Sequence, residues 1–180
     1  MKNFIIKLSN PKVIFVTLGA FLILCVFSNT LFRQDFTYLT QTNGYSPEQA
    51  FSLLDHVGES GRTAHLLILI ADFVMVLLYS GFLIGANYNT FHYWVKNCVI
   101  ISVITFFPIV LAFIQLGEIS VLAILITHYQ NKFEGAARLA SLLTEIKFYL
   151  TPVCFLLPII GLCVKIIVIF MQKRMKHSET

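Results

Sequence analysis

Charged residues are scarce in this 180-residue chain. Lys, Arg, Asp and Glu together make up 12% of it, about half of their usual share in a soluble domain. Hydrophobic residues make up 57%, and the mean hydropathy is +0.80. Because several long stretches contain no charge at all, the composition excludes an ordinary soluble domain and indicates a protein that is solvated mainly by lipid.

Motifs for metal binding, disulfide frameworks and common enzymes are also missing. The four cysteines, Cys25, Cys98, Cys154 and Cys163, all fall in apolar runs, and no two of them form a CxxC pair. The sequence has no HExxH, GxSxG, paired Asp-rich or phosphate-cradling glycine motif. We therefore expect neither a metal nor another cofactor, and a role other than catalysis is favoured.

Four apolar segments are each long enough to cross the hydrocarbon core of a bilayer, which requires about 20 helical residues. Backbone amides cannot remain unpaired in lipid, and the segments lack the alternation of barrel strands, so each must be a helix. The predicted fold class is an all-α membrane protein, a four-transmembrane-helix bundle. Its spans are residues 13–32, 64–86, 95–127 and 148–171.

The spans form one membrane domain, residues 13–172, between an N-terminal segment of residues 1–12 and a basic tail of residues 173–180. Lysines precede the first span, as they do in a signal peptide. That span is longer than a usual signal-peptide core, however, and no small-x-small cleavage site follows it. We therefore predict that it is an uncleaved first helix.

Basic residues predict the orientation of the chain in the membrane. Eight of the thirteen lie on the side that the two termini share, and five lie on the other side. Tyr93 and Trp94 beside Lys96 resemble an aromatic belt on the same side. The sequence therefore predicts a multi-pass protein of the cell (plasma) membrane with both termini in the cytoplasm. The net charge of +4 indicates this orientation rather than binding to nucleic acid.

The connection between the first two spans, residues 33–63, is predicted to be an outer loop that contains a helix. Ser46, Pro47 and Gln49 have the pattern of a capping box with proline at the first helical position. Apolar residues follow at helical spacing, and Gly58 supplies a stop. The sequence therefore predicts a short amphipathic helix in the first outer loop, lying against the ends of the bundle.

Residues 128–147 show a second amphipathic pattern, which is predicted to form a helix that runs into the fourth span. Pro108 in the third span, and Pro152 and Pro158 in the fourth, are predicted to bend those helices. Such bends open space between helices without proving that a ligand occupies it.

Ionisable residues inside the spans are the main candidates for function, because charge is costly in lipid. Asp72 lies about 12 Å along the second span from its outer end, and Glu118 lies at a similar depth in the third span. Other polar residues share faces with these two carboxylates or lie at the outer end of the fourth span. The candidate ligand- or ion-binding cluster consists of Arg62, His65, Asp72, Gln115, Glu118 and Lys147.

The working hypothesis is that this cluster binds or transports a small molecule, an ion or a lipid group, using a desolvated carboxylate that exchanges a proton. One alternative is an intramembrane lipid-modifying enzyme, which needs a cavity where His65 faces Asp72 or Glu118. Another is a non-catalytic subunit of a larger complex, in which the cluster only holds the helices in register. A fully paired and sealed Glu118 would favour that second alternative.

Two further patterns suggest partners in addition to the surrounding membrane lipid. Arg62 follows a glycine-bracketed turn and is predicted to receive an anionic lipid headgroup, with Lys147 assisting. Gly81 and Gly85 form a small-xxx-small pattern that permits close helix approach. This pattern predicts either packing within the chain or a homo-oligomer through these two glycines.

Overall fold

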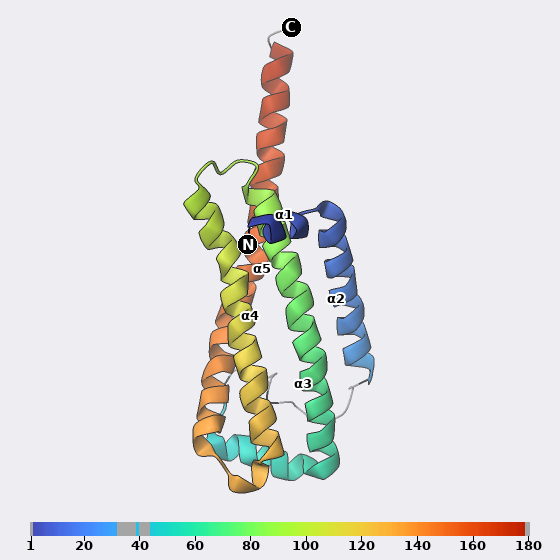
Figure 1. The fold of residues 1–180 in the computed structure, drawn as a ribbon, viewed down its shortest axis with the longest axis vertical. Coiled ribbons are helices and arrows are strands. Elements are labelled where there is room, and N and C mark those ends of the chain that lie inside the picture. The colour runs from blue at the N-terminus through green and yellow to red at the C-terminus, as the bar shows by residue number, and fades with distance from the viewer. Residues whose placement is uncertain (1, 32–38, 40–43, 179–180) are drawn as a thin grey trace.

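Helices account for nearly all of the chain that the structure describes, residues 2–31, 39 and 44–178, and these residues contain no strand. In the computed structural model, four helices are long and apolar enough to cross a membrane. The predicted all-α four-helix fold of a multi-pass membrane protein is therefore confirmed (Figure 1). The elements are α1 (Lys2–Leu8), α2 (Pro11–Leu31), α3 (Pro47–Phe91), α4 (Cys98–Thr127), the 3-10 helix η2 (Tyr129–Asn131) and α5 (Glu134–Ser178).

Helices α3, α4 and α5 form the core of the bundle, and α2 lies outside this core against α3 (Figure 1). None of the α2 side chains that the structure describes is buried. The first turns of α3, η2 and the start of α5 lie at one end of the bundle, here called the cap end. Helix α1 and the last turns of α3 and α5 lie toward the opposite end, the termini end, where α5 projects beyond the other helices (Figure 1).

The predicted helix in the loop between the first two spans is confirmed at the start of α3. The Ser46 side chain accepts a hydrogen bond from the Gln49 amide at 3.3 Å, and the Gln49 side chain accepts one from the Ser46 amide at 2.8 Å. Residues 47–57, the cap helix, then run across the cap end (Figure 1). Gly58 breaks the helical geometry with φ of 66° and ψ of −167°, and there α3 turns into the bundle.

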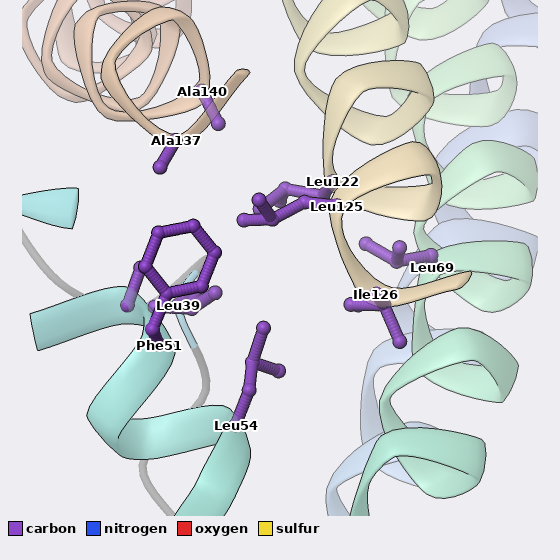
Figure 2. Close-up of a cluster of buried hydrophobic side chains, with 10 residues drawn as sticks. Leu39, Phe51, Leu54, Leu69, Leu122, Leu125, Ile126, Ala137 and Ala140 are labelled. Atoms are coloured by element: carbon purple, nitrogen blue, oxygen red, sulfur yellow. The ribbon is translucent and has the colours of Figure 1, made fainter. Parts of the chain in front are cut away.

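The cap helix is held by a hydrophobic cluster that joins it to α3, α4 and α5 (Figure 2). Phe51 and Leu54 point from the cap helix toward α4, while the small Ala137 and Ala140 let α5 approach from the other side. Fully burying one large apolar side chain away from water contributes about 1.5–3 kcal/mol. The cluster consists of Leu39, Ala50, Phe51, Leu54, Leu69, Leu122, Leu125, Ile126, Ala137 and Ala140.

Several boundaries differ from the predicted ones. Residues 95–97 belong to the turn before α4, because the Asn97 side chain caps that helix by accepting from the Val99 amide at 2.9 Å. The amphipathic segment after α4 does run into the fourth span, as α5, and this helix continues to Ser178 through most of the predicted tail. Helix α1 lies in the N-terminal segment, for which no helix was predicted. Residues 32–38 and 40–43 of the predicted loop lie outside the described residues.

A proline in α4 is accommodated by an asparagine of α3. Pro108 has no amide hydrogen, so the carbonyl of Ile104, four residues earlier, lacks its helical donor. The side-chain amide of Asn87 donates to this carbonyl at 3.4 Å, and Asn87 is completely buried. In lipid a freed carbonyl needs such a partner, so Asn87 fixes how α3 packs against α4.

We expect Asn87→Leu to lower the free energy of unfolding by about 1–3 kcal/mol, because the buried Ile104 carbonyl loses its donor. In a Pro108→Ala background the loss should be smaller, since the amide of residue 108 can then donate to Ile104. Reversible unfolding in mixed micelles of the wild type, both single variants and the double variant measures this coupling. Equal losses in the two backgrounds would contradict the proposed pairing.

The turn after α1 packs against α3 at a glycine. A Cβ atom at Gly85 would lie 2.3 Å from the carbonyl oxygen of Leu8, whereas one at Gly81 would come no nearer than 4.0 Å to the Leu8 side chain. Gly85 therefore permits backbone-to-backbone approach within the chain. Intramolecular packing accounts for this part of the small-residue pattern, and a homo-oligomer through Gly81 and Gly85 stays a prediction.

Gly85→Ala should lower the stability of the bundle by about 1–3 kcal/mol, because the new methyl group overlaps the Leu8 backbone. The matched control is Gly81→Ala, one turn earlier, where the methyl group has room. This control should leave stability unchanged or raise it slightly through better helix propensity. Thermal unfolding of the detergent-solubilised variants compares the two, and similar melting temperatures would show that α1 does not pack as described.

Candidate functional site

A buried ion pair joins α4 to α5. Lys147 Nζ lies 2.7 Å from Glu118 Oε1, and the Thr144 hydroxyl donates to the same oxygen at 2.7 Å. The Glu118 side chain is 2% exposed and that of Lys147 is 18% exposed. Thr144 and Lys147 are three residues apart and so share one face of α5. The carboxylate is therefore enclosed by the bundle, and the lysine reaches it from a partly open edge.

Tyr45 lies over the ion pair at the cap end. Its backbone amide donates to the Ser141 hydroxyl at 2.9 Å, and its own hydroxyl oxygen is buried. Burial raises the pKa of the Tyr45 hydroxyl, and the negative charge of Glu118 acts in the same direction. Tyr45 therefore remains neutral beside the pair.

A second polar contact lies one turn earlier in α4. The Tyr79 hydroxyl donates to Gln115 Oε1, and both residues are buried. The Tyr79 ring packs against Phe21 of α2 and Phe155 of α5, with 5.9 Å between ring centroids in each case. Gln115 and Glu118 share a face of α4. Gln115 joins this helix to α3, and Glu118 joins it to α5.

Asp72 lies on α3, two turns before Tyr79, and is partly buried. Its carboxylate is close enough to Lys147 and Glu118 to interact electrostatically with both. It also interacts electrostatically with the thiol of Cys25 in α2. Within the described part of the chain, no group donates a hydrogen bond to Asp72 and none forms an ion pair with it. Asp72 therefore lies within electrostatic range of the Glu118–Lys147 pair, with no direct partner for its carboxylate among the described residues.

Arg62 has contacts of its own at the cap end. Its Nη1 atom donates to the carbonyl of Leu54 at 3.0 Å, and its guanidinium lies 4.0 Å from the centroid of the Tyr129 ring. These contacts fasten the cap helix to η2. His65, one turn further along α3, is 2% exposed. The structure thus places Asp72 within electrostatic range of the Glu118–Lys147 pair, while Arg62 contacts Leu54 and Tyr129. The anion site of Arg62 and Lys147 stays a prediction.

A surface depression of about 440 Å³ is also found at the cap end. Its lining includes Glu48, Asp55, Lys132 and Glu134, and none of the six predicted site residues belongs to it. The depression is therefore no cavity in which His65 could face a carboxylate. Among the residues that the structure describes, no group of three or more His, Cys, Asp or Glu side chains is arranged to hold a metal ion.

Two residues of the site, Thr144 and Tyr79, were absent from the predicted cluster. The sequence gives only a weak indication of each, namely its spacing from a predicted site residue. Thr144 precedes Lys147 by three residues, and Tyr79 follows Asp72 by seven, so each shares a helix face with a predicted residue. Uncharged residues on such faces are common in membrane helices, however, and only the packing of the helices selects these two.

Comparison with known proteins identified no relative. No protein-family model matches the chain, and no curated protein or solved structure is significantly similar to it. The class of protein therefore rests on the fold and the site: a four-helix, multi-pass membrane protein. Its particular feature is a buried Glu118–Lys147 pair beside a second carboxylate, that of Asp72.

Lys147→Met should lower the free energy of unfolding by about 3–5 kcal/mol, because Glu118 is then buried without its cation. Adding Glu118→Gln should recover most of this loss, since no charge remains unmatched. The control is Arg138→Gln, which breaks the exposed Glu134–Arg138 pair of α5 and should cost less than about 1 kcal/mol. Unfolding in mixed micelles measures all four proteins, and equal losses for the two single variants would refute a sealed pair.

Proposed function

We propose that the bundle binds one proton or one small monovalent cation at Asp72, beside the Glu118–Lys147 pair. The observation that carries the proposal is a charge imbalance among the described residues: the carboxylates of Glu118 and Asp72 both lie within electrostatic range of one ammonium group, that of Lys147. With both carboxylates ionised, this part of the bundle holds one excess negative charge. Such a charge is costly in a poorly solvated interior and is relieved by a bound positive charge.

The surroundings of Asp72 favour a proton or a monovalent cation over a divalent one. Magnesium and calcium ions require six or more oxygen ligands, usually with several carboxylates. Lys147 and Thr144 already bind Glu118, which leaves the Asp72 carboxylate as the acidic ligand among the described residues of this site. A proton needs no further ligand, so it is the simplest occupant.

Access to Asp72 is supported by the position of α2. This helix packs along α3 outside the three-helix core, and Asp72 is close to Cys25 at the boundary between α2 and α3. Because α2 has no buried side chain among those described, it can shift against α3 with less loss of packing than the core helices. Exchange of the bound ion through this boundary makes the site suitable for ion-linked transport as well as binding.

The second candidate function is that of a non-catalytic subunit of a larger membrane complex. The observation that favours it is the sealing of Glu118, whose Oε1 atom accepts from two donors while the side chain is 2% exposed. A pair of this kind fixes helix register without any exchange of ligand. The two candidates differ at Asp72, which exchanges an ion only in the first.

For the placement in the cell, we propose the plasma membrane, with the termini end in the cytoplasm and the cap end outside. The distribution of basic residues, eight against five, supports this orientation.

The test is an infrared titration of the purified protein in lipid nanodiscs. We expect a carboxyl band of a protonated side chain that is lost as the pH rises, because the proton bound at low pH then leaves. The band should be absent in Asp72→Asn and present in Glu118→Gln and in the exposed control Asp55→Asn. If a cation is the occupant, adding sodium or potassium should change the carboxylate bands of the wild type but not those of Asp72→Asn.

Carboxylate bands that respond to neither pH nor cations, and that are identical in the wild type and Asp72→Asn, would refute the ion site. That outcome would favour the structural role instead.

A further inference from the structure

The turn between α1 and α2 is tied to α3 and α5 by a chain of hydrogen bonds at the termini end. The Asn89 side chain donates to the carbonyl of Ser9 in the turn at 3.0 Å. Lys165 of α5 in turn donates to the Asn89 side chain at 2.8 Å and to its backbone carbonyl at 3.4 Å. The ammonium group of Lys165 therefore lies next to the turn that contains Ser9.

This turn gathers positive charge without any matching negative charge. Lys7 and Lys12 flank Ser9 in the sequence, and both are exposed. Among the described residues, Lys165 is bound by neutral oxygens of Asn89, and it lies 5.5 Å from the ring centroid of Tyr93. The described stretches 2–31, 76–117 and 148–178 contain eight basic residues and no Asp or Glu, so no carboxylate from the adjacent helices neutralises the three lysines.

Helix α1 has the form of a helix that lies at a membrane surface. It runs across the bundle rather than along it (Figure 1), and Gly85 lets its end come close to α3. Phe4 is 63% exposed and Ile6 is 46% exposed, although both are apolar. Apolar side chains of such a helix enter the boundary between headgroups and acyl chains, while its lysines extend toward the headgroups.

We propose that the turn between α1 and α2 binds the headgroup of an anionic phospholipid. Lys7, Lys12 and Lys165 supply the positive charge, and the exposed Phe4 lies in the acyl chains beside it. The turn and this ligand are complementary in charge, because a phosphate-bearing anionic lipid supplies the negative charge that the described residues at this end of the protein lack. The site shares no residue with the Asp72 site, so each proposal can be tested and refuted without the other.

The protein carries its own probe for this site. Trp94 is the only tryptophan of the chain, and it lies five residues after Asn89, against the ring of Phe91 at a centroid distance of 5.3 Å. The probe lipids are brominated phosphatidylglycerol and brominated phosphatidylcholine, which quench tryptophan fluorescence when they lie next to it. The ratio of their apparent affinities, measured in mixed bilayers, reports the preference for anionic lipid at the termini end.

We expect phosphatidylglycerol to be preferred by the wild type, and the double variant Lys7→Gln/Lys12→Gln to lose most of that preference. A basic residue near an anionic surface strengthens binding about fivefold, so the double variant should show a reduction of at least about fivefold. Lys132→Gln/Arg138→Gln at the cap end is the matched control and should keep the wild-type ratio. These exposed substitutions should not unfold the protein, which circular dichroism verifies.

A third double variant separates a defined site from diffuse attraction. Lys96→Gln/Arg174→Gln removes two exposed charges from the termini end without touching the turn. It should retain most of the preference for phosphatidylglycerol. The proposal is overturned if the wild type quenches equally with both lipids, or if this variant loses as much preference as Lys7→Gln/Lys12→Gln.

Discussion

The ion pair between Glu118 and Lys147 is the constraint around which the rest of the bundle is arranged. A carboxylate deep in a membrane bundle is tolerated only with a nearby cation and further donors, and Lys147 and Thr144 provide both. Because their hydrogen bonds are short and directional, α4 and α5 have one favourable register. Tyr45 lies beside the pair, and the cap helix covers this end of the bundle with Phe51 and Leu54.

The fold was largely predictable because the membrane imposes local requirements that a sequence displays directly. Helix length follows from bilayer thickness, and the capping box at Ser46 and the stop at Gly58 depend only on residues close in the chain. The carboxylates of Asp72 and Glu118 were also found, since any charge in an apolar run is conspicuous. The pairing of Glu118 with Lys147 was predicted only as one of several options.

The remaining features depend on how the helices rotate about their axes and pack against one another, which hydropathy does not encode. Tyr79 and Thr144 join the site because their faces happen to meet Gln115 and Glu118. Arg62 contacts the ring of Tyr129, which lies far from it in the sequence, so no local pattern predicts this contact. Helix α1 escaped prediction because seven residues are too short for a periodic pattern, and Gly85 acquires its role only once that helix is placed.

Helix α5 has a mechanical consequence for the whole protein. It is a single element of 45 residues, about 68 Å long at 1.5 Å per residue. Lys147 and Lys165 are separated along it by five full turns, so both point from the same side of one rod. Lys147 binds the Glu118 carboxylate in the bundle, and Lys165 binds Asn89 of α3, which in turn donates to the turn at the termini end. A displacement of α5 as one body would therefore move the contact with Glu118 and the contact with Asn89 together.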